Sequence, residues 1–100
     1  QGDEKFQEAI AAGTKAEDEL AEQFRAGVDP ASVDLDPLFD RHRAWIAQMW
    51  GRDCPRDGYG GMADLYLAHP DFRKHFDARG EGFLDWLAQA MRAYAARASG

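Results

Sequence analysis

The sequence predicts an all-α fold in which five helices surround one core, and three observations carry that prediction. Apolar residues recur at steps of three and four along most of the chain, the spacing of one helix face. No stretch alternates apolar and polar residues as a strand would. Glycine and proline fall mostly between the periodic segments. A chain of 100 residues suffices for one core, so residues 1–100 are treated as one domain.

The first predicted helix covers residues 4–26, which are rich in Ala, Glu, Gln and Lys. Its apolar stripe is interrupted at Gly13 and Thr14, so we expect the part before them to be the weaker helix. Gly27 stands where a glycine commonly ends a helix. We therefore expect residues 1 to about 14 to be the most mobile part of the chain.

The second predicted helix covers residues 36–50 and gives the clearest pattern in the chain. Asp36 is the expected N-cap, Pro37 the first helical residue and Gly51 the end of the helix. Residues 28–34, which precede it, are expected to form a loop. The apolar stripe consists of Leu38, Phe39, His42, Trp45, Ile46, Met49 and Trp50.

The last three predicted helices are shorter or less regular. The third covers residues 59–66 and ends before Pro70, because the residue before a proline avoids the helical region. The fourth covers residues 71–76. Gly82 marks the junction to the fifth helix, which covers residues 83–97.

The loop between the second and third helices holds the only cysteine of the chain, Cys54. Arg52 and Arg56 would lower the pKa of its thiol, whereas Asp53 would raise it. A reactive thiol and a small buried hydrophobe are both compatible with this pattern. The second is favoured because no histidine stands nearby in the sequence to act as a base.

The glycines that follow Cys54 do not form a phosphate-binding loop. No Gly-Lys-Ser/Thr sequence follows them and no strand precedes them. We expect Gly58, Gly60 and Gly61 to permit a tight turn and close packing of helices.

Charge and composition exclude several classes of function. The net charge of −6 and the pI near 4.9 argue against a nucleic-acid-binding surface. No apolar run is long enough for a membrane span, and no signal peptide is visible. A single cysteine cannot form an internal disulfide, so a cytoplasmic location is expected. The chain begins with Gln1, and we expect it to be part of a longer protein.

Catalytic and metal chemistry have little support in the sequence. No carboxylate pair or nucleophile–base pair is visible, so we predict no catalytic residue and no enzyme. The three histidines, His42, His69 and His75, do not have the spacing of a metal site, and we expect no metal and no cofactor. His42 lies on an apolar stripe, which is typical of a hydrogen-bonded core histidine. A haem or metal ligand is the alternative.

Aromatic and methionine residues are abundant for a chain of this length. Most must form the core, but the surplus would also suit a cleft for a bulky apolar ligand. Composition alone leaves packing and ligand binding equally open. If a cleft exists, we predict that it is lined by Trp45, Met49, Tyr59, Met62, Tyr66 and Trp86.

In order and spacing, several motifs resemble the TipAS antibiotic-recognition domain, the C-terminal part of certain MerR-family regulators. The resemblance covers nearly the whole chain, and it begins upstream with the helix ending FRAGVDPAS. The matching elements further on are His42-Arg43, Asp53-Cys54, Met62 to Tyr66, Asp71-Phe72, Phe76-Asp77, and Gly82 with Leu87 and Ala90.

The resemblance implies a globin-like arrangement of the helices and a sensor that binds thiopeptides or other bulky ligands in a cleft. It also implies an upstream winged-helix DNA-binding domain and a coiled-coil dimerisation arm. The full-length protein would then be a homodimer that contacts DNA only through its upstream domain. Residues 1–100 alone would be a monomeric effector domain.

One departure from the family pattern bears on the binding mode. Antibiotic-binding members carry a second cysteine that can attack a dehydroalanine of the ligand. An ungapped count places that position at Gly61, so we expect non-covalent binding. Other members, such as regulators of the SkgA type, serve stress or stationary-phase regulation. The alternative function is therefore a protein-interaction module with a vestigial cleft.

Overall fold

Five α-helices and one short 3₁₀ helix make up the part of the chain that the computed structural model describes, residues 2–99, with side chains described at residues 7, 8 and 11–97. These elements are α1 (Gly2–Arg25), the 3₁₀ helix η1 (Val33–Leu35), α2 (Asp36–Trp50), α3 (Arg56–Ala68), α4 (Pro70–Asp77) and α5 (Phe83–Ser99). No strand occurs among residues 2–99, so the all-α, five-helix prediction is confirmed. Within the same range, no helix combines the length and the apolar character needed to cross a membrane.

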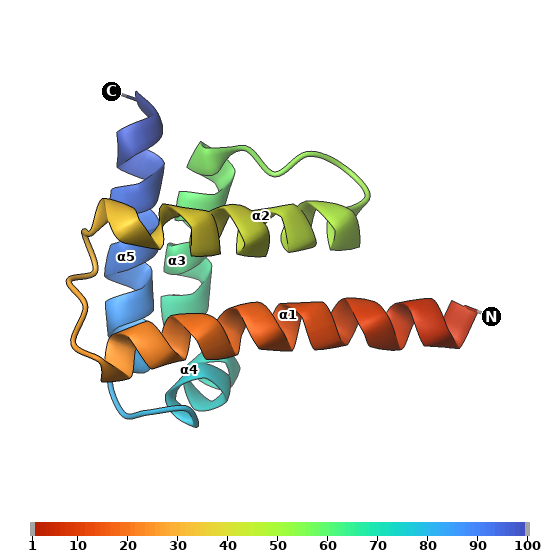
Figure 1. The fold of residues 1–100 in the computed structure, drawn as a ribbon, viewed down its shortest axis with the longest axis horizontal. Helices are drawn as coiled ribbons and strands as arrows, with labels where there is room; N and C mark the ends of the chain where they lie inside the picture. Colours follow the sequence, from red (N-terminus) through yellow and green to blue (C-terminus); the bar gives the residue numbers. More distant parts are fainter. Residues whose placement is uncertain (1, 100) are drawn as a thin grey trace.

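The helices form two crossed pairs (Figure 1). α3 and α5 lie side by side, and α1 and α2 run across them as an antiparallel pair, while α4 lies beyond α1. The N-terminal end of α1 extends past the end of α2. The core lies where the two pairs cross, and its largest fully buried side chains are Leu20, Leu35, Phe39, Tyr59, Phe76, Phe83, Leu84, Leu87, Met91 and Tyr94.

The C-terminal half of α1 is held by charged groups as well as by the core. Arg79, just after α4, pairs with Glu17 at 3.1 Å and with Asp18 at 2.9 Å. The Nε2 atom of His75 lies 3.0 Å from Glu17. Arg25, at the end of α1, also contacts this segment, because it donates a hydrogen bond of 2.9 Å to the carbonyl oxygen of Arg79. These contacts fix α1 against the end of α4 at the side of the molecule opposite its N-terminus.

The first helix, predicted over residues 4–26, is confirmed, since α1 runs from Gly2 to Arg25 through Gly13 and Thr14 as one helix. The weaker first part of this helix stays a prediction. The mobility of residues 1 to about 14 stays a prediction, and Gln1 lies outside the described residues.

The predicted turn at Gly58, Gly60 and Gly61 is wrong, since α3 begins at Arg56 and includes all three. The predicted close packing is confirmed at Gly60, which is buried. A Cβ atom built there would lie 2.6 Å from the Cβ atom of Ala95 in α5. Gly61 has open space at the same position, with no atom within 4 Å.

The start of α2 differs from the prediction as well. Residues 33–35 form a 3₁₀ helix rather than a loop, and the Ser32 hydroxyl caps it by accepting a 3.1 Å hydrogen bond from the Asp34 amide. Leu35 occupies the N-cap of α2, and Asp36 is its first residue. The Asp36 carboxylate pairs with Arg97 of α5 instead of capping the helix.

Candidate ligand-binding site

A groove of about 610 Å³ runs between α1 and α2. Small side chains from both helices form its apolar part, and charged or amide side chains stand along its edges. Glu19 and Arg41 form an ion pair of 2.8 Å across it. The full lining is Ala12, Lys15, Ala16, Glu19, Arg41, Ala44, Trp45 and Gln48.

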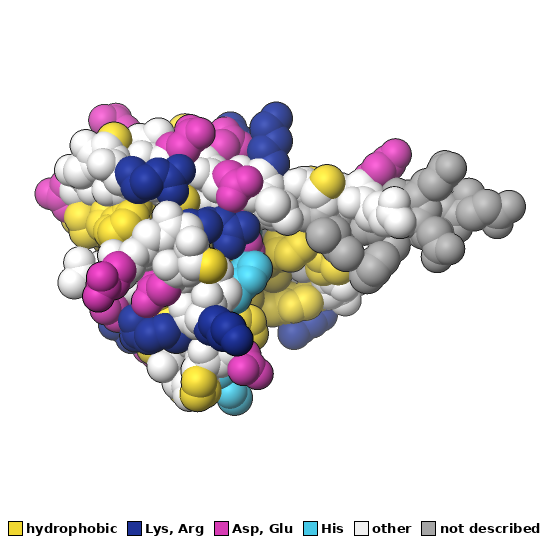
Figure 2. All heavy atoms as spheres, turned by 90° about the horizontal axis from the view of Figure 1, so that it is seen from below, with side chains coloured by type: hydrophobic (Ala, Val, Ile, Leu, Met, Phe, Trp, Pro, Cys, Tyr) yellow, Lys and Arg dark blue, Asp and Glu magenta, His cyan; other side chains and the backbone are white. Residues whose placement is uncertain are grey.

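The surface around α1 is mixed in character (Figure 2). Lys and Arg side chains alternate with Asp and Glu over the face seen there, without a continuous patch of one sign. A group of hydrophobic side chains lies beside α1 where this helix leaves the globular body. Such a surface suits a ligand that is largely apolar better than it suits a polyanion.

Trp45 is the aromatic wall of the groove, and Gly13 determines where its ring lies. The indole is half-buried and lies directly against the backbone of α1. A Cβ atom at Gly13 would stand 2.5 Å from two indole carbons, closer than such atoms can approach. Gly13, which interrupts the apolar stripe of the first helix in the sequence, is therefore a contact site for the Trp45 ring.

His42 lies behind Trp45, one turn earlier in α2. The two rings are nearly parallel, with centroids 5.9 Å apart and an interplanar angle of 11°. The imidazole is fully buried, and its Nδ1 atom lies 2.7 Å from the hydroxyl oxygen of Tyr59. Burial lowers the pKa of His42 to about 4, so the ring is neutral at pH 7.

The second ring nitrogen of His42 has no hydrogen-bond partner among the described residues. Its Nε2 atom is fully buried. The expectation of a hydrogen-bonded core histidine therefore holds for one nitrogen only. A buried polar atom left unpaired costs about 1–3 kcal/mol, so it calls for an explanation.

The residues predicted to line a cleft are spread over the molecule. Trp45 lines the groove, and Met49 lies one turn further along α2 with 43% of its surface exposed. Tyr59 is completely buried, and burial is the main reason that the pKa of its hydroxyl is raised well above 10. Tyr66 is also buried, with Phe76 at 4.9 Å between ring centroids.

The other two predicted residues lie on α3 and α5. Met62 is half-buried and packs against the core. Trp86 stacks on Phe83 and donates a 2.9 Å hydrogen bond from its indole nitrogen to the carbonyl oxygen of Val28. Trp86 thus fastens the loop after α1 rather than facing the groove.

The sequence reasoning missed the α1 side of the groove. Ala12 and Ala16 are four residues apart, as are Lys15 and Glu19, so each pair lies on one face of the helix. Ala12, Gly13 and Ala16 give this face of the helix little side-chain bulk, and that pattern is the signal in the sequence for a groove. Gly13 was interpreted only as a sign of a weaker helix.

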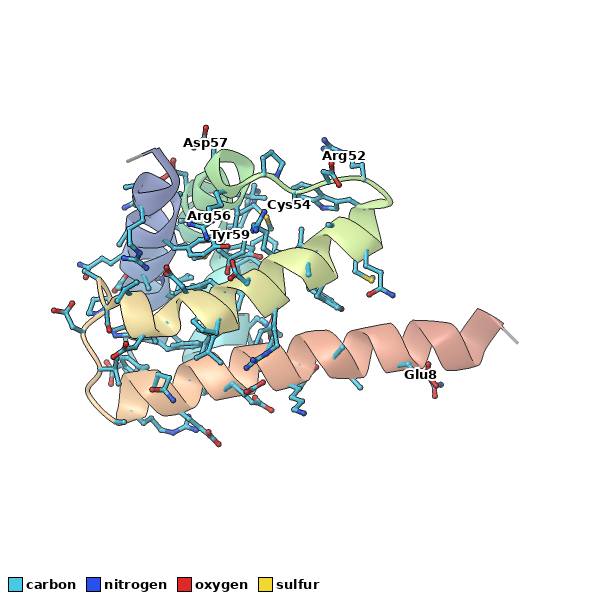
Figure 3. The ribbon with its side chains drawn as sticks, turned by 45° about the horizontal axis from the view of Figure 1, so that its top comes forward. Glu8, Arg52, Cys54, Arg56, Asp57 and Tyr59 are labelled. Carbon is cyan, nitrogen blue, oxygen red and sulfur yellow. The ribbon has the colours of Figure 1, made fainter. Side chains whose placement is uncertain are left out.

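Cys54 lies on the inner side of the loop between α2 and α3 (Figure 3), whereas Arg52 points outward from this loop. Only 3% of Cys54 is exposed, and burial raises the pKa of its thiol despite Arg43 and Arg52 nearby. Arg43 fixes the loop by donating hydrogen bonds to the Cys54 carbonyl at 3.0 Å and to the Tyr94 hydroxyl at 2.9 Å. The geometry therefore favours a packing role for Cys54.

One family model and two relatives match the chain. The model of the TipAS antibiotic-recognition domain matches residues 1–94. The chain is 32% identical over 91 residues to the HTH-type transcriptional regulator SkgA of Caulobacter vibrioides, from strain NA1000 / CB15N and from strain ATCC 19089 / CIP 103742 / CB 15. This alignment covers 91% of the chain but only 34% of each relative. No solved structure is a significant match. The chain therefore belongs to the TipAS antibiotic-recognition domain family.

Proposed function

We propose that this chain is the ligand-sensing effector domain of a transcriptional regulator and that it binds bulky apolar or thiopeptide-like ligands in the groove between α1 and α2. The groove beside Trp45 carries this proposal. Its volume of about 610 Å³ lies within the range of drug-sized binding sites, roughly 300–1,000 Å³. A thiopeptide is larger, so part of it would extend over the exposed Met49.

Binding is non-covalent in this proposal. The only thiol, that of Cys54, is buried and has a raised pKa, so it is neither accessible nor ionised at pH 7. Affinity would come from burying apolar ligand surface against Trp45 and the alanines of both helices. Lys15, Arg41 and Gln48 at the edges would orient the polar parts of the ligand.

The signal would reach DNA through other parts of the full-length protein. We propose an upstream winged-helix domain of the MerR type and a dimerisation arm, in a homodimeric cytoplasmic regulator. The match to HTH-type regulators roughly three times the aligned length supports this arrangement. A ligand that pulls α1 and α2 together would move the N-terminal end of α1, which extends beyond the other helices.

Proton–nitrogen correlation spectra with thiostrepton, and with a panel of apolar drugs, test the proposal. We expect the largest shifts in residues 12–19 and 41–49, with smaller shifts at the N-terminal end of α1. Trp45→Ala should weaken binding about tenfold or more, since an aromatic anchor typically contributes more than 1 kcal/mol. Trp50→Ala is the matched control, because Trp50 is exposed and does not line the groove. An unmoved spectrum across the panel would contradict the ligand-sensing function.

A protein-interaction module of a stress or stationary-phase regulator is the second candidate. Met49 and Trp50, 43% and 42% exposed, favour it because they place two large apolar side chains at the end of α2. Trp50→Ser should then abolish binding to partner proteins, and no ligand of the panel should shift the amides of the groove. Ligand-induced shifts in the groove, with partner binding unchanged in Trp50→Ser, would argue for the first function alone.

A further inference from the structure

We propose that the groove between α1 and α2 selects bulky aromatic molecules that carry a single carboxylate, and that Lys15 binds this carboxylate. The proposal rests on the proposed function of the groove, to which it adds the charge of the ligand and a residue that determines specificity. The charged side chains of the lining are Lys15, Glu19 and Arg41. Together they carry one net positive charge, whereas the whole chain carries −6.

Lys15 is the unpaired charge of the groove. The acidic residues three and four positions after it, Asp18 and Glu19, are its natural ion-pair partners on the helix. Arg79 binds Asp18 at 2.9 Å, however, and Arg41 binds Glu19 at 2.8 Å. No ion pair or hydrogen bond joins the Lys15 side chain to another described residue, and the side chain is exposed. Its ammonium group is therefore available to a ligand.

Lys15 stands level with the aromatic wall of the groove. α1 and α2 are antiparallel, and the pair of Glu19 with Arg41 shows which residues lie opposite each other. One turn away from this pair, Lys15 comes opposite Trp45, whose ring lies against Gly13. Both side chains line the same groove, so one ligand can place an aromatic ring against the indole and a negative charge beside the ammonium group.

Glu19 limits the ligand to one negative charge. Its carboxylate lines the same groove, so it would repel a second negative charge on the ligand. A phosphate, with a charge of about −1.5 to −2 at pH 7, is therefore less suitable than a carboxylate. Arg41 uses one terminal nitrogen for Glu19, so its other N–H groups and the amide of Gln48 can donate to the ligand.

2-Naphthoate and 2-naphthamide are a matched pair of probes, because they share the ring system and nearly the same size but differ in charge. We expect 2-naphthoate to bind about fivefold more tightly at about 50 mM salt, the effect of a solvent-exposed charge contact. At about 500 mM salt this preference should fall to about twofold or less, because salt screens the contact. Titrations followed by the amide shifts of residues 12–19 and 41–49 measure both affinities.

Lys15→Gln tests the residue itself. This change should remove the preference for 2-naphthoate and leave the affinity for 2-naphthamide unchanged, since the apolar contacts remain. Lys74→Gln is the control, because it alters the net charge equally at an exposed position of α4 outside the groove. Glu19→Gln should increase the preference, because it removes the negative charge from the lining.

The outcomes separate this inference from the proposed function. If no probe and no ligand of the panel moves the amides of residues 12–19 and 41–49, the groove is not a ligand site. If both probes bind equally well at low salt, the groove binds ligands without selecting their charge, and the inference is overturned. An equal loss of preference in Lys15→Gln and Lys74→Gln would also overturn it, because the overall charge of the domain would then be the cause.

Discussion

Two glycines bring helices close together in this domain, and the atoms that they face are of different kinds. Gly60 of α3 faces the Cβ atom of Ala95 in α5, 2.6 Å from where its own Cβ would stand. Gly13 of α1 faces the ring of Trp45 in α2, and the nearest indole carbons lie 2.5 Å from where a Cβ atom of Gly13 would stand. A methyl group fixed to a helix moves only with the helix, whereas an indole moves by side-chain rotation.

The difference divides the molecule into a rigid part and an adjustable part. The α3–α5 contact is completed by buried rings, such as Tyr59 and Tyr94 with centroids 5.5 Å apart, so opening it would expose these rings to water. The α1–α2 contact encloses a groove of about 610 Å³ with a movable wall. A response to ligand should therefore involve α1 and α2, while α3 and α5 provide the base against which they move.

The largest expected effect concerns His42, which joins the two parts through Tyr59. Burial lowers the pKa of His42 to about 4 from the ordinary 6.5, so the unfolded chain takes up a proton in that interval and the folded chain does not. The unfolded state binds more protons there, and stability therefore rises with pH between 4 and 6.5 and is constant above. The shift is worth about 3 kcal/mol of unfolding free energy, which is lost as the pH falls from 7 to 4.

Urea unfolding at half-unit steps of pH, combined with an NMR titration of His42, measures this effect. His42→Phe should flatten the dependence between pH 5 and 6.5, where carboxylates contribute little. His69→Asn serves as the control, because His69 is exposed, and it should keep the full slope. A slope that persists in His42→Phe would show that other groups cause it, and that His42 is not held neutral by burial.

The next effect compares the glycines directly. Gly60→Ala should destabilise the domain by about 1–3 kcal/mol, because overpacking against Ala95 exceeds the gain in helix propensity. Gly61→Ala, one residue later in open space, should stabilise it by up to about 1 kcal/mol. Gly13→Ala should stay within about 1 kcal/mol of the unchanged domain, since the indole can turn aside.

Denaturant unfolding of the three variants under one condition ranks their free energies of unfolding. The rigid and adjustable parts are distinguished only if Gly13→Ala is clearly more stable than Gly60→Ala. Equal destabilisation of the two would mean that Trp45 is as immobile as a helix backbone, and the division proposed above would fail.

These glycines also show how far the sequence alone can lead. Periodicity predicted the helices because the apolar stripe of each is a local property. The stripe predicted for α2 is buried at Phe39, His42 and Ile46, whereas Met49 and Trp50 at its end are exposed. The contact of Gly13 with Trp45 was not predicted, and Gly60 was assigned its close packing but placed in a turn, because the partner of each glycine is a side chain more than thirty residues away. No local sequence rule distinguishes a glycine that ends a helix from a glycine that lets a side chain of another helix pack close to the backbone.

The same limit explains the candidate site. Trp45 and Tyr59 both stand on apolar stripes, and sequence reasoning treated them alike. Tyr59 faces the crossing point of the helix pairs and is fully buried, whereas Trp45 faces α1 near the end of the contact and borders the groove. The way the helices cross decides which aromatic ring lines the groove and which ring is buried in the core. This crossing is a property of the assembled fold, so a local sequence pattern does not show it.

The smallest effect concerns the ion pair between Glu19 and Arg41 across the groove. Their side chains are 32% and 55% exposed, so solvent screens the pair, and a double-mutant cycle with Glu19→Gln and Arg41→Gln should give a coupling of about 0.2–1 kcal/mol. The pair of Glu17 with Arg79, at 12% and 18% exposure, is the matched comparison on the same helix and should couple more strongly. If the Glu19–Arg41 coupling were the larger of the two and did not respond to salt, charge would be clamping α1 to α2. The groove could then not be the adjustable side of the molecule.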